Sequence, residues 1–232
     1  MQLHHSGTPE PPVLELSALN GTEDNPVTIY ISAYSVDGSA NASIQLIIRI
    51  ISFPPGSRLS VGTFNGKIWI LDAAEFGDVE LILPQHSSGR FEITAELLHA
   101  QSNSTWIATA QFTVLAVADA PTLNVIHNPC IDTGSFVFSI NSTLVDLDGS
   151  EMLLVTVSGL PSGTQLSAGQ VNKEGIYSLE PAELKRSIIA TVPSSSLDTL
   201  TIVFTSTATE TSNNSTASTS TAISVSHCQQ GT

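Results

Sequence analysis

The sequence predicts an all-β protein made of two similar β-sandwich domains, and three observations support this. Segment 145–169, VDLDGSEMLLVTVSGLPSGTQLSAG, resembles segment 36–62, VDGSANASIQLIIRIISFPPGSRLSVG. The two segments lie about 108 residues apart, and a period of that size indicates a duplicated domain. Ser and Thr are abundant while Lys and Arg total only 7, which favours strands over helices. Short apolar runs also alternate with polar residues, as in half-buried strands.

The first domain is assigned to residues 13–119, because residues 1–12 lack periodicity and are interpreted as a linker or a cloning remnant. Alternation predicts strands at 13–16, 27–33 and 44–50, the last ended by Pro54 and Pro55. Asn65-Gly66 is a favoured hairpin turn. It leads into a strand at 67–71, where Trp69 is expected to supply the largest core contact of this domain.

One helical turn is expected in each domain. In the first, Asp72 precedes Glu75 by three residues, and in the second Glu180 precedes Glu183 with Pro181 between them. Short strands at 79–84 and 188–193 follow. Each domain then ends in a long hairpin, 91–97 with 106–117 and 200–209 with 217–226. The second domain is assigned to residues 120–232, and segment 118–121 is a junction too short to be a floppy tether.

Charge and motif content exclude several classes of function. The net charge is −14, and the 7 basic residues are scattered, so a nucleic-acid surface is not expected. An acidic surface suits cation binding or plain solubility. The sequence has no Gly-x-Ser-x-Gly elbow, no His-Glu-x-x-His helix and no Gly-rich phosphate loop, so an enzyme is not expected. No apolar run reaches a membrane span and no signal-peptide core follows Met1, so the chain is expected to be a fragment or a processed segment.

Six Asn-x-Ser/Thr triplets suggest N-glycosylation and therefore an extracellular or cell-surface location. The candidate asparagines are Asn20, Asn41, Asn103, Asn141, Asn213 and Asn214. Three of them, Asn103, Asn213 and Asn214, fall at the predicted tips of the long hairpins, which are the exposed positions that a glycan requires.

Several motifs together resemble a known class of extracellular repeat. They are Glu-Asp-Asn-Pro at 23–26, Asp-Leu-Asp-Gly-Ser-Glu at 146–151, the turn at 160–167, the turns at 71–76 and 179–184, and Ala-Asp-Ala-Pro at 118–121. This pattern is similar to the cadherin-like, immunoglobulin-like tandem repeats of large surface adhesins and extracellular matrix proteins. The resemblance covers residues 13 to about 226 and implies two Greek-key β-sandwiches joined end to end.

The same resemblance implies Ca²⁺ binding at domain junctions, where carboxylates supply the oxygen ligands that Ca²⁺ requires. The candidate ligands are Glu23, Asp24, Asp37, Asp119, Asp146, Asp148 and Glu151. Two departures from the repeat pattern stand against a complete site: Ser35 replaces the leading Asp in the first copy, and Ile131-Asp132-Thr133 replaces Glu-Asp in the second. Asp-Gly is also good turn chemistry without any metal, and that alternative stays open.

The two cysteines, Cys130 and Cys228, flank the second domain only. Because an immunoglobulin-like sandwich brings its first and last strands together at one edge, they are expected to form one disulfide, with two free buried thiols as the alternative. The first domain has no such link and is expected to unfold first on heating.

The leading functional hypothesis is a non-catalytic structural or adhesive segment of a long glycosylated extracellular filament, whose modules give reach and stiffness and are rigidified by Ca²⁺. Its partners would be other modules of the same filament, other surface proteins, or glycans. The alternative is a recognition module that binds carbohydrate or another copy of itself through exposed loops. Trp69 and Trp106 lie in strand-like stretches and are expected in the core, which favours the first hypothesis.

Overall fold

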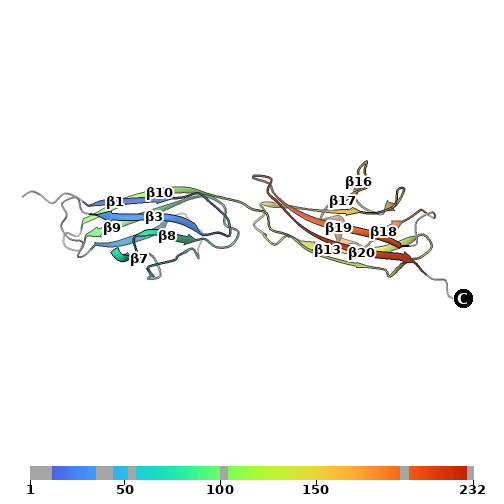
Figure 1. Ribbon diagram of the computed structural model, residues 1–232, viewed down its shortest axis with the longest axis horizontal. Helices are drawn as coiled ribbons and strands as arrows, with labels where there is room; N and C mark the ends of the chain where they lie inside the picture. Colours follow the sequence, from blue (N-terminus) through green and yellow to red (C-terminus); the bar gives the residue numbers. More distant parts are fainter. Residues whose placement is uncertain (1–11, 35–43, 52–55, 100–103, 194–198, 229–232) are drawn as a thin grey trace, which may run out of the picture. The chain divides into compact units, whose positions relative to one another are not determined.

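The computed structural model describes residues 12–34, 44–51, 56–99, 104–193 and 199–228 (Figure 1). Asp37, Asn41 and Asn103, which the sequence nominates as site residues, lie outside these ranges. The described chain is built of β-strands with two single turns of 3-10 helix, which confirms the all-β prediction. It divides into two compact units, Met1–Ala116 and Val117–Thr232.

The first unit is a sandwich of two sheets. The four-stranded sheet has the order β1–β3–β8–β5, where β1 is Val13–Ala18, β3 Val27–Tyr34, β8 Gly77–Ile82 and β5 Arg58–Leu59. The six-stranded sheet has the order β2–β10–β9–β4–β7–β6, where β2 is Gly21–Thr22, β10 Ser104–Leu115, β9 Gly89–His99, β4 Ile44–Ile51, β7 Trp69–Asp72 and β6 Thr63–Phe64. The chain crosses repeatedly between the two sheets, as in a Greek-key immunoglobulin-like sandwich.

Period-two alternation accounts for the core of the first unit. In β3, Val27, Ile29 and Ile31 are buried while Tyr30 is exposed, so the predicted apolar face is the one that packs inward. Trp69 is only partly buried. It packs at the margin of the core beside Phe64, with ring centroids 5.5 Å apart, rather than supplying the largest core contact as predicted.

The second unit repeats this connectivity. Its four-stranded sheet is β11–β13–β18–β15, where β11 is Thr122–His127, β13 Ser135–Thr143, β18 Ile188–Thr191 and β15 Gln165–Leu166. Its six-stranded sheet is β12–β20–β19–β14–β17–β16, where β12 is Cys130–Ile131, β20 Thr216–His227, β19 Thr199–Glu210, β14 Glu151–Ser158, β17 Tyr177–Leu179 and β16 Gln170–Val171. Both predicted long hairpins are present, and Figure 1 shows β19 beside β20 in this unit.

Aromatic rings fill the centre of the second core. Phe138 and Phe204 are fully buried and meet edge to face across the two sheets, with centroids 5.2 Å apart. The unit therefore has its own hydrophobic core, built from the inward faces of both sheets.

The predicted helical turns are single turns of 3-10 helix, η1 at Ala73–Glu75 and η2 at Glu183–Lys185. In η1, Glu75 Oε2 accepts a hydrogen bond from the Asp72 N–H at 2.9 Å, and Oε1 accepts one from the Gly62 N–H at 3.1 Å. Glu183 repeats both bonds to the backbone of Glu180 and Gly169, each at 2.8 Å. One carboxylate thus ties the helical turn to the loop at Gly62 in the first unit and at Gly169 in the second.

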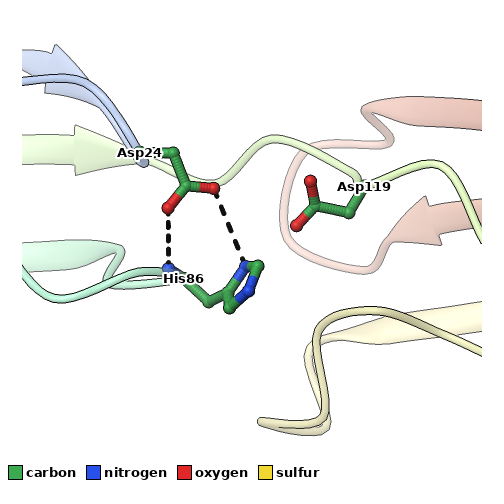
Figure 2. A group of neighbouring side chains, drawn as sticks. All are labelled: Asp24, His86 and Asp119. Carbon is green, nitrogen blue, oxygen red and sulfur yellow. Dashed lines mark hydrogen bonds and ion pairs between the residues drawn. The ribbon is translucent and has the colours of Figure 1, made fainter.

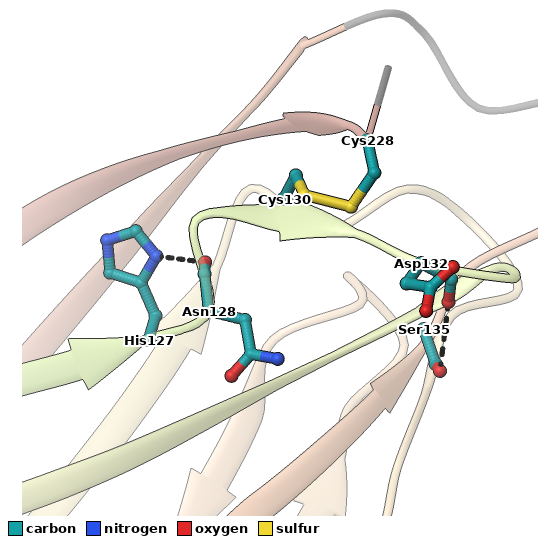
Figure 3. Close-up of a disulfide and its surroundings, with 6 residues drawn as sticks. All are labelled: His127, Asn128, Cys130, Asp132, Ser135 and Cys228. Atoms are coloured by element: carbon teal, nitrogen blue, oxygen red, sulfur yellow. Dashed lines mark hydrogen bonds between the residues drawn. A yellow bond between two sulfur atoms is a disulfide. The ribbon is translucent and has the colours of Figure 1, made fainter. Parts of the chain in front are cut away.

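Cys130 and Cys228 form a disulfide, which confirms the predicted pairing (Figure 3). The structure also identifies the strand involved. After β11 the chain crosses to the other sheet as β12, which runs parallel to the end of β20 with Cys130 opposite Ser226. The bond therefore closes the second unit through this short crossing strand, and not through its first strand.

Candidate functional site

Four carboxylates of the second unit gather where four of its strands begin or end. Asp146 lies in the loop that follows β13, Glu151 is the first residue of β14, and Glu210 is the last residue of β19. Asp119 precedes β11 and its backbone N–H donates to Glu151 Oε1 at 2.8 Å. Glu151 and Glu210 are direct cross-strand partners in the β14–β19 ladder. We call Asp119, Asp146, Glu151 and Glu210 the carboxylate cluster.

Three of these side chains are buried, although buried carboxylates are rare in proteins. Glu210 is 0%, Asp146 4% and Glu151 7% exposed. One oxygen of each is hydrogen-bonded: Asp146 Oδ1 accepts from the Asp148 N–H at 2.9 Å, and Glu210 Oε1 accepts from the Ser150 hydroxyl at 3.1 Å. The other oxygens, Asp146 Oδ2, Glu151 Oε2 and Glu210 Oε2, are buried without a hydrogen-bond partner among the described residues.

The electrostatics of the cluster are unfavourable without a counter-charge. Like charges directly opposite in an antiparallel pair repel each other, and burial strengthens that repulsion. Burial raises the pKa of Glu151, and repulsion from Glu210, Asp119 and Asp146 raises it further, against the lowering effect of the Asp119 N–H. Within the described part of the chain, no Lys or Arg forms an ion pair with Asp146, Glu151 or Glu210.

The chemistry of the donor atoms in this cluster suits a hard divalent cation. All of its side-chain ligand atoms are carboxylate oxygens, which Ca²⁺ prefers. The three unpartnered oxygens are buried acceptors, for which a cation would supply the missing counter-charge. The arrangement offers neither sulfur nor imidazole, so it does not resemble a zinc site.

Sequence reasoning found three of these residues and missed the fourth. Asp119, Asp146 and Glu151 are nominated by their motifs, whereas Glu210 ends the segment Ser-Thr-Ala-Thr-Glu, which looks like an ordinary strand end. Asp148 is exposed, and its Oδ1 accepts from the Ser150 N–H at 2.7 Å. Asp148 therefore shapes the loop around the cluster, as its Asp-Gly turn chemistry suggests.

The first-unit candidates have a different environment. Glu23 is buried, while Asp24 is exposed and has a positive φ of 59°. Figure 2 shows Asp24 turned toward His86: the His86 N–H donates to Asp24 Oδ1 at 3.0 Å, and His86 Nδ1 lies 3.7 Å from Oδ2. Nothing in the sequence pairs these two residues, which are 62 positions apart.

The described sequons are accessible. Asn20, Asn141, Asn213 and Asn214 are all exposed, and the last two form the tip of the β19–β20 hairpin. Asn20 Oδ1 accepts from the Thr113 N–H at 2.8 Å, and Asn20 borders a surface hollow of about 470 Å³ that Arg90 and Gln111 also line.

Among the described residues, no helix is long and apolar enough to cross a membrane.

Comparison with known proteins gives structural similarity without sequence similarity. No protein-family model and no curated protein sequence matches this chain. Among solved structures, Drosophila N-cadherin EC1-4 is similar at 12% identity and a TM-score of 0.43, over 95% of this chain and 50% of that chain. Human protocadherin-24 EC1-2 is similar at 12% identity and a TM-score of 0.40, over 97% of this chain and 100% of that one. The Yersinia pseudotuberculosis adhesin InvE is similar at 10% identity and a TM-score of 0.31, over 90% of this chain and 58% of that one.

Proposed function

We propose that this chain is a non-catalytic structural or adhesive segment of an extracellular or cell-surface protein, and that its second unit binds Ca²⁺ at the carboxylate cluster. Its partners are other modules of the same filament, other surface proteins, or glycans. The N-linked glycans would be carried by the exposed sequons.

The observation that carries this proposal is the set of three buried carboxylates with unpartnered oxygens in the second unit. Burying carboxylates without a counter-charge costs free energy. A bound cation would supply that counter-charge, which is why the three buried carboxylates support a metal site. The disulfide supports the extracellular assignment, because such bonds persist in oxidising compartments.

A bound Ca²⁺ would hold the start of the second unit together. Segment 118–121 is already attached to that unit: the Ala118 N–H donates to Ser215 Oγ at 3.2 Å, and the Thr219 hydroxyl donates to the Pro121 carbonyl at 2.6 Å. The Asp119 N–H adds the bond to Glu151. Neutralising Glu151 and Glu210 together with Asp119 would stiffen this attachment, and that is the property a load-bearing filament needs.

Isothermal titration calorimetry with CaCl₂ tests the proposal on the whole chain. We expect saturable binding that weakens at least tenfold in Glu210→Gln and in Glu151→Gln, because each removes a buried charged ligand. Glu174→Gln is the matched control, since Glu174 is exposed in the turn between β16 and β17. Equal binding by all three variants would place Ca²⁺ elsewhere, and no heat at millimolar Ca²⁺ would refute the metal site.

A further inference from the structure

Large apolar side chains are exposed beside the carboxylate cluster, on the second unit. Leu147 is 82%, Met152 61% and Leu154 41% exposed. Leu147 lies in the loop after β13, while Met152 and Leu154 point outward from β14 two residues apart. Single exposed apolar residues are ordinary on a protein surface, but a contiguous group of them marks an interaction site.

These residues border one surface hollow of about 790 Å³, which we call the apolar groove. Leu144 and Leu147 line it from the loop, Met152 and Leu154 from β14, and Pro181 from the segment before η2. Thr209 of β19 completes it. Because Leu and Met dominate the lining, the groove suits an apolar side chain. The flexible thioether of Met152 lets the wall adapt to that side chain.

The charged residues that line the apolar groove are both acidic, Glu151 and Glu180. Glu151 also belongs to the carboxylate cluster, and the whole chain carries a net charge of −14. A second copy of this chain would bring more negative charge to the same place, whereas a cationic partner would be attracted. The negative charge around the apolar groove therefore favours a cationic partner over a second copy of this chain.

We propose that the apolar groove binds an extended segment of a partner protein that presents an aliphatic or aromatic side chain flanked by Lys or Arg. The apolar side chain enters the groove between Leu147 and Met152, and a flanking cation lies near Glu180. This inference goes beyond the proposed structural function and does not depend on bound Ca²⁺, because Glu180 and the apolar lining lie outside the cluster.

Synthetic 12-residue peptides test the proposal against the whole isotope-labelled chain by NMR titration. The probe peptide carries a central Leu-Ser-Leu flanked by Lys residues. One comparison peptide has Glu in place of every Lys, and another has Ser in place of both Leu residues. We expect the Lys/Leu peptide to bind and to shift the backbone signals of Leu144, Met152 and Thr209. We expect the Glu peptide and the Ser peptide each to bind at least tenfold more weakly.

The double variant L147S/M152S should reduce affinity for the Lys/Leu peptide at least tenfold while leaving the melting temperature unchanged, since both side chains are exposed. Ile126→Ser is the matched control, because Ile126 is 68% exposed but lies on β11 of the other sheet. Running the titrations with Ca²⁺ and with EDTA separates this groove from the metal site: groove binding should persist in both. Equal binding by the Glu peptide, equal loss in Ile126→Ser, or no binding at millimolar peptide would overturn the proposal. Binding of the chain to phosphatidylcholine vesicles that L147S/M152S abolishes, without peptide binding, would reassign the surface to lipid.

Discussion

Glu151 is the residue at which burial, hydrogen bonding and repulsion meet. Its Oε1 is fixed by the Asp119 N–H, its Oε2 is buried without a hydrogen-bond partner in the described chain, and Glu210 lies directly across the ladder. Burial raises the pKa of Glu151, and repulsion from Glu210, Asp119 and Asp146 adds to that rise, while the Asp119 N–H opposes it. A cation and a proton therefore compete for the same oxygens.

In EDTA, we expect the second unit to lose stability as the pH rises from about 4 through the raised pKa of Glu151. A carboxyl group whose folded pKa lies above its unfolded pKa binds more protons in the folded state, so its stabilising contribution is present below the unfolded value and is lost above the folded one. Thermal unfolding at a series of pH values measures this.

Comparison with Glu151→Gln isolates that contribution from those of the other carboxylates. The variant cannot ionise at position 151, so its stability relative to the wild type should improve as the pH rises. If the difference in stability between the wild type and Glu151→Gln stayed constant from pH 4 to pH 8, ionisation of Glu151 would not affect folding stability.

The sequence predicts the members of this cluster that lie close together along the chain and misses the one that lies far away. Asp146 and Glu151 share one motif, so the sequence could place them together. Glu210 joins them only through the β14–β19 register, which pairs residues 59 positions apart along the chain. A single sequence shows which residues are apolar but not which residue of one long strand lies opposite which residue of another. The Asp24–His86 contact was missed because both residues lie in turns that only the tertiary fold brings together.

At the scale of elements, strands and turns follow from local pattern. Alternation located β1, β3 and both long hairpins, because one face of each strand packs into a core. The short strands β2 and β12 were not predicted, since two residues carry no periodicity. Their role is tertiary: each runs parallel to the last strand of its unit and closes that edge of the sheet.

Replacing Glu183 by Ala should lower the free energy of unfolding of the second unit by about 2 kcal/mol, because it removes one partly buried and one exposed hydrogen bond to a charged group. The change removes the bonds to the Gly169 and Glu180 N–H groups together. Urea denaturation measures the effect. Glu174→Ala, at an exposed turn, should change stability by less than about 0.5 kcal/mol. A Glu183→Ala variant as stable as this control would show that the carboxylate bridge contributes nothing.

The disulfide should stabilise the second unit strongly, because it spans 98 residues. In the chain-entropy model a loop of this length contributes roughly 4–5 kcal/mol. Replacing Cys130 and Cys228 together by Ala should lower the denaturant midpoint of the second unit and leave that of the first unit unchanged. Urea unfolding followed by tryptophan fluorescence reports on the first unit, which holds Trp69 and Trp106, and circular dichroism reports on both. If the midpoint of the first unit, reported by tryptophan fluorescence, fell as far as that of the second unit, the disulfide would not stabilise the second unit alone.

At the scale of the whole molecule, one architecture is used twice with different reinforcement. Both units have the same strand order and the same Glu bridge at the helical turn. The second unit alone carries the disulfide, and it contains the carboxylate cluster, in which a bound cation would add to its stability. The sequence anticipated the duplication because the two copies share turn motifs. That the two units stand end to end stays a prediction.

Differential scanning calorimetry of the whole chain, in Ca²⁺ and in EDTA, tests the metal site most directly. At a Ca²⁺ concentration 100 times the dissociation constant, binding adds about 2.7 kcal/mol to the free energy of unfolding of the second unit. Its melting temperature should therefore rise by on the order of 10 °C. We predict that Ca²⁺ does not change the melting temperature of the first unit, which tryptophan fluorescence identifies. Glu210→Gln should abolish the shift of the second unit, and Glu174→Gln should retain it. Transitions that coincide in Ca²⁺ and EDTA, or an equal shift in Glu210→Gln, would contradict Ca²⁺ binding at the carboxylate cluster.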